Sequence, residues 1–127
     1  MPFVRIDLPA SISPERALRA GDAVHRAMGD VIAVPADDRF QVLARHGEGV
    51  MVSTPEYLGV RHTNKVLFIQ INLSPGRTVQ QKRQLFARIA TDVSEAADVS
   101  PADVIVHLVE THRENWSFGE GVAHYTL

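Results

Sequence analysis

The sequence contains no cysteine, few aromatic residues and no large excess of charge of either sign. Without cysteine, the chain forms no disulfide, thiolate metal site or cysteine nucleophile. Its formal net charge of -2 argues against a general nucleic-acid binder, because such proteins normally carry a basic excess. No apolar run approaches the ~18 residues of a membrane span, and charges at Arg5 and Asp7 are unlike a signal peptide. These absences predict a cytoplasmic protein that binds neither nucleic acid nor a membrane.

Familiar metal-binding and hydrolytic motifs are also missing. The six histidines occur without His-Glu-x-x-His spacing, and the serines occur without a Gly-x-Ser-x-Gly motif. Two Gly-Glu-Gly-Val segments are present, but no helix is expected after either one. A hairpin or bulge therefore explains their glycines better than a phosphate-binding loop. We expect neither a metal ion nor an organic cofactor, and no hydrolase triad.

The first half of the 127-residue chain follows a strand–helix–strand pattern. Alternating residues at 3–8 predict a strand, and Ser13 followed by Pro14 is typical of a helix start. The stretch 33–38 ends this helix, and residues 40–44 predict a second strand. The expected buried face of the helix consists of apolar residues at near-helical spacing: Ala17, Leu18, Ala20, Val24, Ala27 and Met28.

The second half repeats the same order of elements. Residues 66–73 form an apolar run that predicts a strand, and Thr78 with Gln81 matches a capping box at the start of a helix. Residues 104–110 predict the last strand. The expected buried face of this second helix consists of Phe86, Ile89, Ala90, Val93 and Ala97.

Short matching segments indicate that the two halves are copies of one unit. Residues 6–8 (IDL) match 71–73 (INL), and 34–38 (VPADD) resemble 99–103 (VSPAD), both at an offset of 65 residues. Coincidence between two common βα patterns is the alternative. The matched strand ends, helix caps and turns favour duplication.

This organisation predicts one α/β (α+β) domain over residues 1–127, built from pseudo-repeats at about 2–60 and 64–127. Each βαβ unit places its two strands parallel with a right-handed crossover. Two such units pair into a four-stranded mixed sheet with both helices on one face. If a pseudo-twofold axis relates the units, Pro2 approaches the segment 74–77 at the end of the third strand.

The order of several motifs resembles the tautomerase superfamily, and most closely its malonate-semialdehyde-decarboxylase-like branch. The motifs are the initial Met-Pro, VPADDRFQV (34–42), LSPGRT (73–78) and ENWSFGEGVAHY (114–125), within a double βαβ of about this length. The resemblance extends over essentially the whole chain. It implies a tautomerase (MIF-like) fold and a homotrimer, which mimics the hexamer of shorter single-unit relatives such as 4-oxalocrotonate tautomerase.

Pro2 is the main candidate for catalysis. Removal of Met1 turns its nitrogen into a secondary amine, and the neutral form of such an amine takes up a proton. Burial and nearby positive charge both lower the pKa of an amine in this position. The alternative is that proline is simply a common second residue, but the resemblance implies the catalytic role.

Arg77 is the candidate anchor for a substrate carboxylate. It directly precedes Thr78, so its guanidinium and the start of the helix both attract an anion. The resemblance implies that arginines on this loop bind the substrate acid. The characterised decarboxylases have Arg-Pro-Arg before the threonine, whereas this chain reads Ser74-Pro75-Gly76-Arg77, so one of two arginines is missing. A solvated surface charge is the alternative.

Asp38 is the third catalytic candidate. The resemblance implies that an aspartate in the Pro-x-x-Asp-Arg segment orients or activates a water molecule. A carboxylate that only caps a turn is the alternative, and the parallel Asp103 in the second half favours that view. We expect Arg39 to be the ion-pair partner of Asp38.

Aromatic residues are candidates for contact with the substrate. The resemblance suggests that Trp116, Phe118 and Tyr125 form an apolar wall that desolvates Pro2, while ordinary core or trimer packing is the alternative. Tyr57 and Arg61 lie in the connection between the halves. A further hypothesis is that these two side chains reach the pocket of a neighbouring subunit.

Three functions remain open from the sequence. The first is tautomerisation of a small 2-oxo acid or enol carboxylate, with Pro2 as acid and base and Arg77 as anchor. The second is a lyase or hydratase, such as a malonate semialdehyde decarboxylase-like enzyme, with a water activated by Asp38. The third is a non-catalytic trimer that binds small acids.

Overall fold

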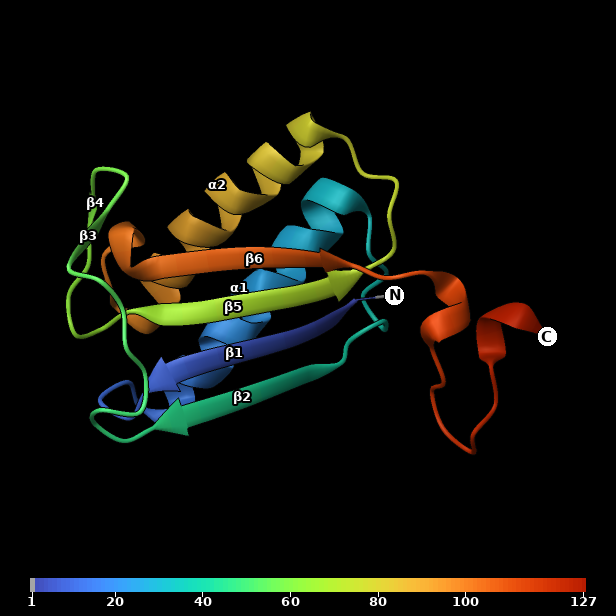
Figure 1. Cartoon of the computed structure of the whole chain (residues 1–127), viewed down its shortest axis with the longest axis horizontal. Helices are drawn as coiled ribbons and strands as arrows, with labels where there is room; N and C mark the ends of the chain where they lie inside the picture. Colours follow the sequence, from blue (N-terminus) through green and yellow to red (C-terminus); the bar gives the residue numbers. More distant parts are fainter. Residues whose placement is uncertain (1) are drawn as a thin grey trace.

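The computed structural model describes residues 2–127 and contains a four-stranded sheet with two helices packed on one face (Figure 1). The spatial order of its strands is β2-β1-β5-β6. Strands β1 and β2 are parallel, β5 and β6 are parallel, and the two pairs join through antiparallel β1 and β5. The predicted mixed sheet is therefore confirmed. The strands are β1 (Phe3–Pro9), β2 (Gln41–His46), β5 (Leu67–Leu73) and β6 (Val104–Glu110).

The two helices begin at the predicted residues. Helix α1 (Pro14–Ile32) starts with the Ser13 hydroxyl accepting a hydrogen bond from the Arg16 backbone N–H at 3.2 Å. Helix α2 (Val79–Ala97) starts with a complete capping box between Thr78 and Gln81. Within residues 2–127, no helix combines the length and apolar character needed to cross a membrane.

The core lies between the helices and the inner face of the sheet, where apolar residues of both helices and of all four strands of the sheet meet. The predicted burial of two residues is wrong, because Leu18 is 59% exposed and Phe86 is 38% exposed. On α2 the inward positions recur every fourth residue from Leu85, so Phe86 lies about 100° around the helix. Leu18 is displaced in the same way from buried Ala17.

The register between β1 and β5 has twofold symmetry. Val4 pairs with Ile71 and Ile6 with Ile69, so the offset of 65 residues exchanges one pair for the other. The same offset relates Pro14 to Val79 at the starts of the helices, and Ile32 to Ala97 at their ends. Positions in the sheet strands and helices of one unit thus have structural counterparts in the other, and differences between these counterparts are informative.

A short connection between the units forms a separate hairpin at the opposite end of the sheet from the start of β1 (Figure 1). Its strands are β3 (Glu56–Tyr57) and β4 (Val60–Arg61). The sequence placed Tyr57 and Arg61 in this connection, and Gly59 adopts a φ of 82° that favours glycine.

An ionic network crosses the sheet face that the helices leave uncovered. The Asp7 carboxylate accepts hydrogen bonds from the His46 ring at 2.6 Å and from the Arg5 guanidinium at 3.1 Å. Partial burial is the largest influence and raises the pKa of Asp7, but the contacts with His46 and Arg5 together hold that pKa below 3.8.

Loss of the His46 contact should move acid unfolding to higher pH. Because the pKa of Asp7 is lower in the folded state, its ionised carboxylate stabilises the fold above the unfolded-state pKa. That contribution disappears as pH falls through the folded-state pKa. In His46→Ala, circular dichroism against pH should give a higher unfolding midpoint, whereas the exposed-residue control His107→Ala should not. Equal midpoints in both variants would contradict this account.

Candidate active site

Pro2 is buried at one end of the sheet, directly before the central strand β1. Two residues later, the Val4 backbone N–H donates to the Phe40 carbonyl at 2.9 Å, which brings the segment before β2 beside the chain start. On the other side, Phe3 pairs with Asn72, so Pro2 lies next to the end of β5. The expected removal of Met1 concerns a residue outside the described part of the chain.

Arg77 lies in the loop that leaves β5 at this same end of the sheet. Its side chain is half-buried, and its Nη1 donates to the Ser74 carbonyl at 3.0 Å, which folds the side chain back over the loop. Gly76 permits this tight path with a φ of 121°. The loop ends at the Thr78 cap, so the guanidinium and the positive end of α2 occupy one region.

Asp38 ends a turn just before β2, at the same end of the sheet as Pro2. Its backbone N–H donates to the Pro35 carbonyl at 3.0 Å. Its Oδ1 atom is buried and has no hydrogen-bond partner among residues 2–127. A buried polar atom without a partner costs about 1–3 kcal/mol. Such an atom suggests that a water molecule or a reactant completes its hydrogen bonds.

The expected ion pair between Asp38 and Arg39 is wrong. Arg39 instead donates to the Asp22 carboxylate on α1 at 2.7 Å and to Gln41 at 3.1 Å. Consecutive side chains of an extended segment point to opposite sides, whereas residues two apart share a side. Arg39 therefore shares the side of Gln41, and Asp38 does not.

The counterpart of Asp38 in the second unit is Asp103, and the two carboxylates differ in their contacts. Asp103 is 1% exposed and accepts from the Thr63 backbone N–H at 2.8 Å and from the Thr63 hydroxyl at 2.5 Å. Thr63 lies in the chain that leads into β5. Asp103 is thus the structural turn residue that the sequence allowed, while its counterpart Asp38 keeps an unpaired oxygen.

An aromatic cluster covers the same end of the sheet. Trp116 stacks on Phe118 with ring centroids 5.4 Å apart, and Tyr125 meets Phe118 edge-on at 5.3 Å. Phe40 also contacts Phe118, at 5.9 Å. Because the Phe40 carbonyl binds Val4, the cluster adjoins the strand that carries Pro2. The structure therefore brings together the three predicted aromatic residues.

Sequence reasoning missed Phe40 and Arg113 as members of this region. Arg113 lies over the Tyr125 ring at 4.5 Å, a distance typical of a cation–π contact. A cleft of about 510 Å³ runs between this pair and the Ser74–Pro75 segment of the Arg77 loop. The signal for Phe40 was its place two residues after Asp38, but nothing local in the sequence pairs Arg113 with Tyr125.

Tyr57 and Arg61 lie in the β3–β4 hairpin at the far end of the sheet (Figure 1). Tyr57 is 64% exposed. Within one chain the structure does not bring either residue near Pro2. Their contact with a neighbouring subunit stays a prediction.

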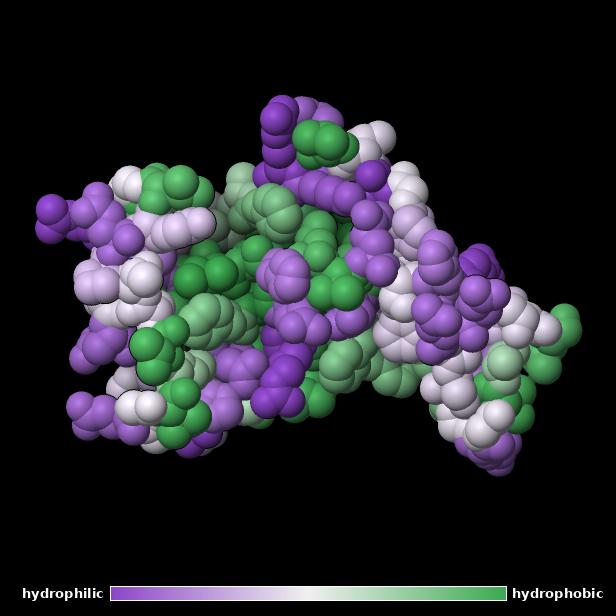
Figure 2. Space-filling view, in the orientation of Figure 1, coloured by the Kyte–Doolittle hydropathy of each residue, from purple (hydrophilic) through white to green (hydrophobic). Residues whose placement is uncertain are grey.

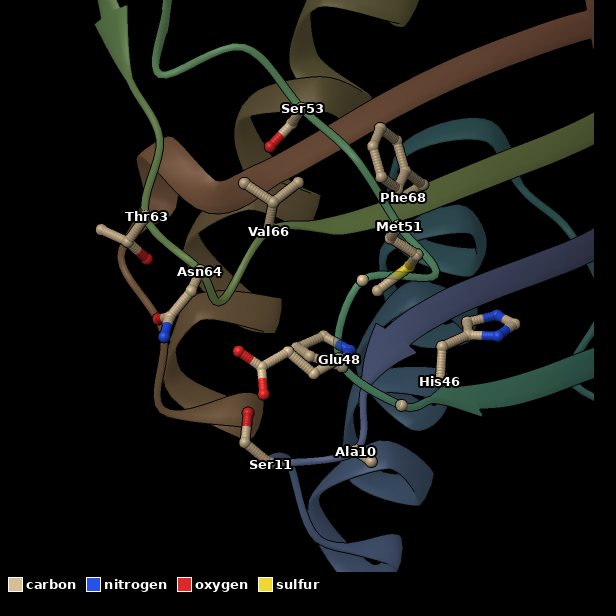
Figure 3. A pocket seen from close by; sticks show the side chains of 13 residues that line it. Ala10, Ser11, His46, Glu48, Met51, Ser53, Thr63, Asn64, Val66 and Phe68 are labelled. Carbon is tan, nitrogen blue, oxygen red and sulfur yellow. The ribbon is translucent and has the colours of Figure 1, made fainter.

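A second cavity, of about 350 Å³, lies at the end of the sheet opposite to Pro2 (Figure 3). Polar side chains such as Ser11, His46 and Glu48 line it. The offset of 65 residues makes it the counterpart of the Pro2 end, but there Leu67 stands in place of Pro2 and Ile12 in place of Arg77. A leucine inside the chain has no basic nitrogen and isoleucine holds no anion, so the Pro2 end is the candidate active site.

No group of three or more histidine, aspartate or glutamate side chains in the described residues is arranged to hold a metal ion. The candidate site consists of buried Pro2, Arg77 beside the start of α2, the unpaired Oδ1 of Asp38 and the aromatic cluster. Such a set is suited to moving protons on a small carboxylate.

Comparisons with known proteins identify the family of this chain. A family model described as tautomerase enzyme matches residues 38–119. A probable tautomerase of Bacillus subtilis, YusQ, is 34% identical over 97% of this chain and 97% of its own length. Among solved structures, FG41 malonate semialdehyde decarboxylase inhibited by 3-bromopropiolate is 35% identical, with a TM-score of 0.89, over 97% of this chain and 93% of that one.

A more distant structure shares the fold alone. The Q0 fused 4-OT, described as a wild-type symmetric trimer, is 18% identical with a TM-score of 0.78, and the match covers 94% of each chain. The family model matches more than half of the chain, and the Bacillus relative matches nearly all of it. On these grounds the chain belongs to the tautomerase family.

Proposed function

We propose that this chain catalyses keto–enol tautomerisation of a small 2-oxo acid, with Pro2 as general acid and base after removal of Met1. Arg77 anchors the substrate carboxylate. The observation that carries the proposal is the position of buried Pro2 at the same end of the sheet as half-buried Arg77 and the start of α2. Membership of the tautomerase family supports it.

The chemistry requires one proton to move between oxygen and carbon. In ketonisation, the neutral amine of Pro2 takes the proton of the enol hydroxyl, the O–H electrons form the carbonyl, and the C=C electrons take a proton from the resulting ammonium. The amine is regenerated, so the step balances without a further reactant. The wall of Trp116, Phe118 and Tyr125 supports this by excluding water, which favours the neutral amine.

The direct test uses enol phenylpyruvate. The purified protein without Met1, verified by intact mass, should ketonise it faster than buffer alone, as followed by the loss of enol absorbance. Absence of any acceleration with a verified free Pro2 would contradict the proposal.

A second candidate function is decarboxylation or hydration of a three-carbon oxo acid. The observation that favours it is the buried, unpaired Oδ1 of Asp38, which is suited to orient a water molecule. The similarity to a malonate semialdehyde decarboxylase supports it. The incomplete arginine pair at Ser74-Pro75-Gly76-Arg77 weighs against it.

The substitution Asp38→Asn separates the two functions. We expect decarboxylation or hydration to fall by roughly 10²-fold, because the base that activates water is lost, while ketonisation survives. The matched control is Asp37→Asn, since Asp37 is the exposed neighbour in the same turn. Equal loss of both activities in Asp38→Asn would remove the distinct role of Asp38.

We also propose that the chain acts as a homotrimer. Apolar side chains on the uncovered sheet face support this (Figure 2). Phe68 pairs with Asp7 and is half-buried, and Val42 pairs with Arg5 and is 39% exposed. Leu58 at the tip of the β3–β4 hairpin is 88% exposed. Sedimentation equilibrium should give three times the chain mass of 14.0 kDa, and a monomer mass at micromolar concentration would contradict the trimer.

A further inference from the structure

Helix α1 contacts the turn that carries Asp38 through one side chain. The His25 Nε2 atom lies 2.8 Å from the Ala36 carbonyl oxygen, two residues before Asp38. A carbonyl only accepts, so the hydrogen of this bond lies on Nε2. The other ring nitrogen, Nδ1, is buried and has no partner in the described part of the chain. The contact between His25 Nε2 and the Ala36 carbonyl is therefore present although the Nδ1 atom of the same ring is buried without a partner.

The second unit shows the same turn without a histidine. Asp38 and Asp103 both donate their backbone N–H to the residue three positions earlier, at 3.0 and 2.9 Å. The counterpart of His25 is Ala90, which cannot hold the second turn. That turn is held instead by the carboxylate of Asp103, through its two bonds to Thr63.

The two turns are thus held in place by different contacts. Where both oxygens of the aspartate are paired with the protein, as in Asp103, no side chain of α2 hydrogen-bonds to residues 100–103 in the described part of the chain. Where the Oδ1 atom of the aspartate stays unpaired, α1 supplies the support through His25.

A second set of contacts fixes the chain after Asp38. Arg39 binds Asp22 at 2.7 Å, and the Gln41 side chain donates to the Gly21 carbonyl at 2.9 Å, both on α1. His25 fixes the chain before Asp38. Asp38 therefore lies between two attachments to the same helix, and only the first of them lies within the turn itself.

We propose that His25 is a positioning residue for Asp38, which holds the 35–38 turn so that Oδ1 stays available to a water molecule or reactant. This rests on the role of Asp38 in the second candidate function, decarboxylation or hydration. His25 touches neither substrate nor reacting atoms in this account. It acts through the Ala36 carbonyl.

The test compares His25→Phe, which keeps a ring but removes the donor, with His25→Gln, which restores an N–H. The matched control is His62→Phe, because the His62 ring makes a similar contact with the Thr54 carbonyl at 2.9 Å, in the connection between the units. Hydrogen exchange of the Asp38 amide reports the turn without requiring activity. One lost hydrogen bond is worth about 1 kcal/mol, so protection should fall about five-fold in His25→Phe only.

Kinetics complete the test. His25→Phe should lower the kcat of the Asp38-dependent reaction about five-fold without raising KM, and His25→Gln should restore it. In the Asp38→Asn background, His25→Phe should cause no further loss. An unchanged exchange rate of the Asp38 amide in His25→Phe would overturn the inference. Inactivity of the wild-type protein in decarboxylation and hydration would instead overturn that candidate function, and the exchange result would still decide the role of His25.

Discussion

Replacing Pro2 with alanine is expected to slow enol ketonisation by roughly 10²-fold or more, within the range that a positioned acid–base group contributes. Alanine still supplies an amine after Met1 is removed, but it lacks the ring that fixes the direction of the nitrogen lone pair. The proline lies buried at the end of the sheet, directly before β1. The measurement is kcat/KM for enol phenylpyruvate.

The control for this prediction is Pro9→Ala, at the other end of β1. Both variants should show melting temperatures within a few degrees of the wild type, so that loss of activity in Pro2→Ala alone reports chemistry. Full activity in Pro2→Ala would remove Pro2 from the mechanism.

Arg77→Ala should produce the second largest effect, a rise in KM of roughly 10–100-fold with a smaller change in kcat. A hydrogen bond to a charged group contributes about 1.5–3 kcal/mol, and the substrate carboxylate would lose such a bond. The side chain is already held over its loop by the bond to the Ser74 carbonyl, so little ordering is needed on binding.

Arg83→Ala provides the comparison, because Arg83 is an exposed arginine on α2, the helix that begins just after the Arg77 loop. Its loss should leave KM near the wild-type value. Arg77→Lys should recover part of the affinity, since it keeps the charge but loses the planar pair of donors. Equal KM values for Arg77→Ala and Arg83→Ala would show that Arg77 does not hold the substrate.

The fold was predictable because its signals are local. Alternation at 3–8 and the caps at Ser13 and Thr78 are visible within short windows, and the offset of 65 residues follows from comparing short segments of the two halves. Each of these features reappears in the structure. Leu18 and Phe86 were misplaced because a neighbouring residue, Ala17 or Leu85, takes the inward position. Periodicity defines a stripe, and packing decides its exact edge.

The candidate site was only partly predictable, because several of its contacts join residues that are far apart in the sequence. Pro2, Arg77 and Asp38 were named from their residue types and from a resemblance, and the order of the strands places them at one end of the sheet. Arg39 was assigned to the wrong carboxylate because its partner Asp22 lies on a helix that only the tertiary fold brings near. The contact of His25 with Ala36 is likewise non-local.

The central claim is that the nitrogen of Pro2 acts as a free amine. The most direct measurement compares one protein in two forms: with an extra residue before Pro2, and after that residue has been removed by a specific protease. The first form has an amide nitrogen without basicity, and the side chains of residues 2–127 are identical in both. Ketonisation of enol phenylpyruvate should be absent in the blocked form and appear on removal. Equal rates in the two forms would contradict the account.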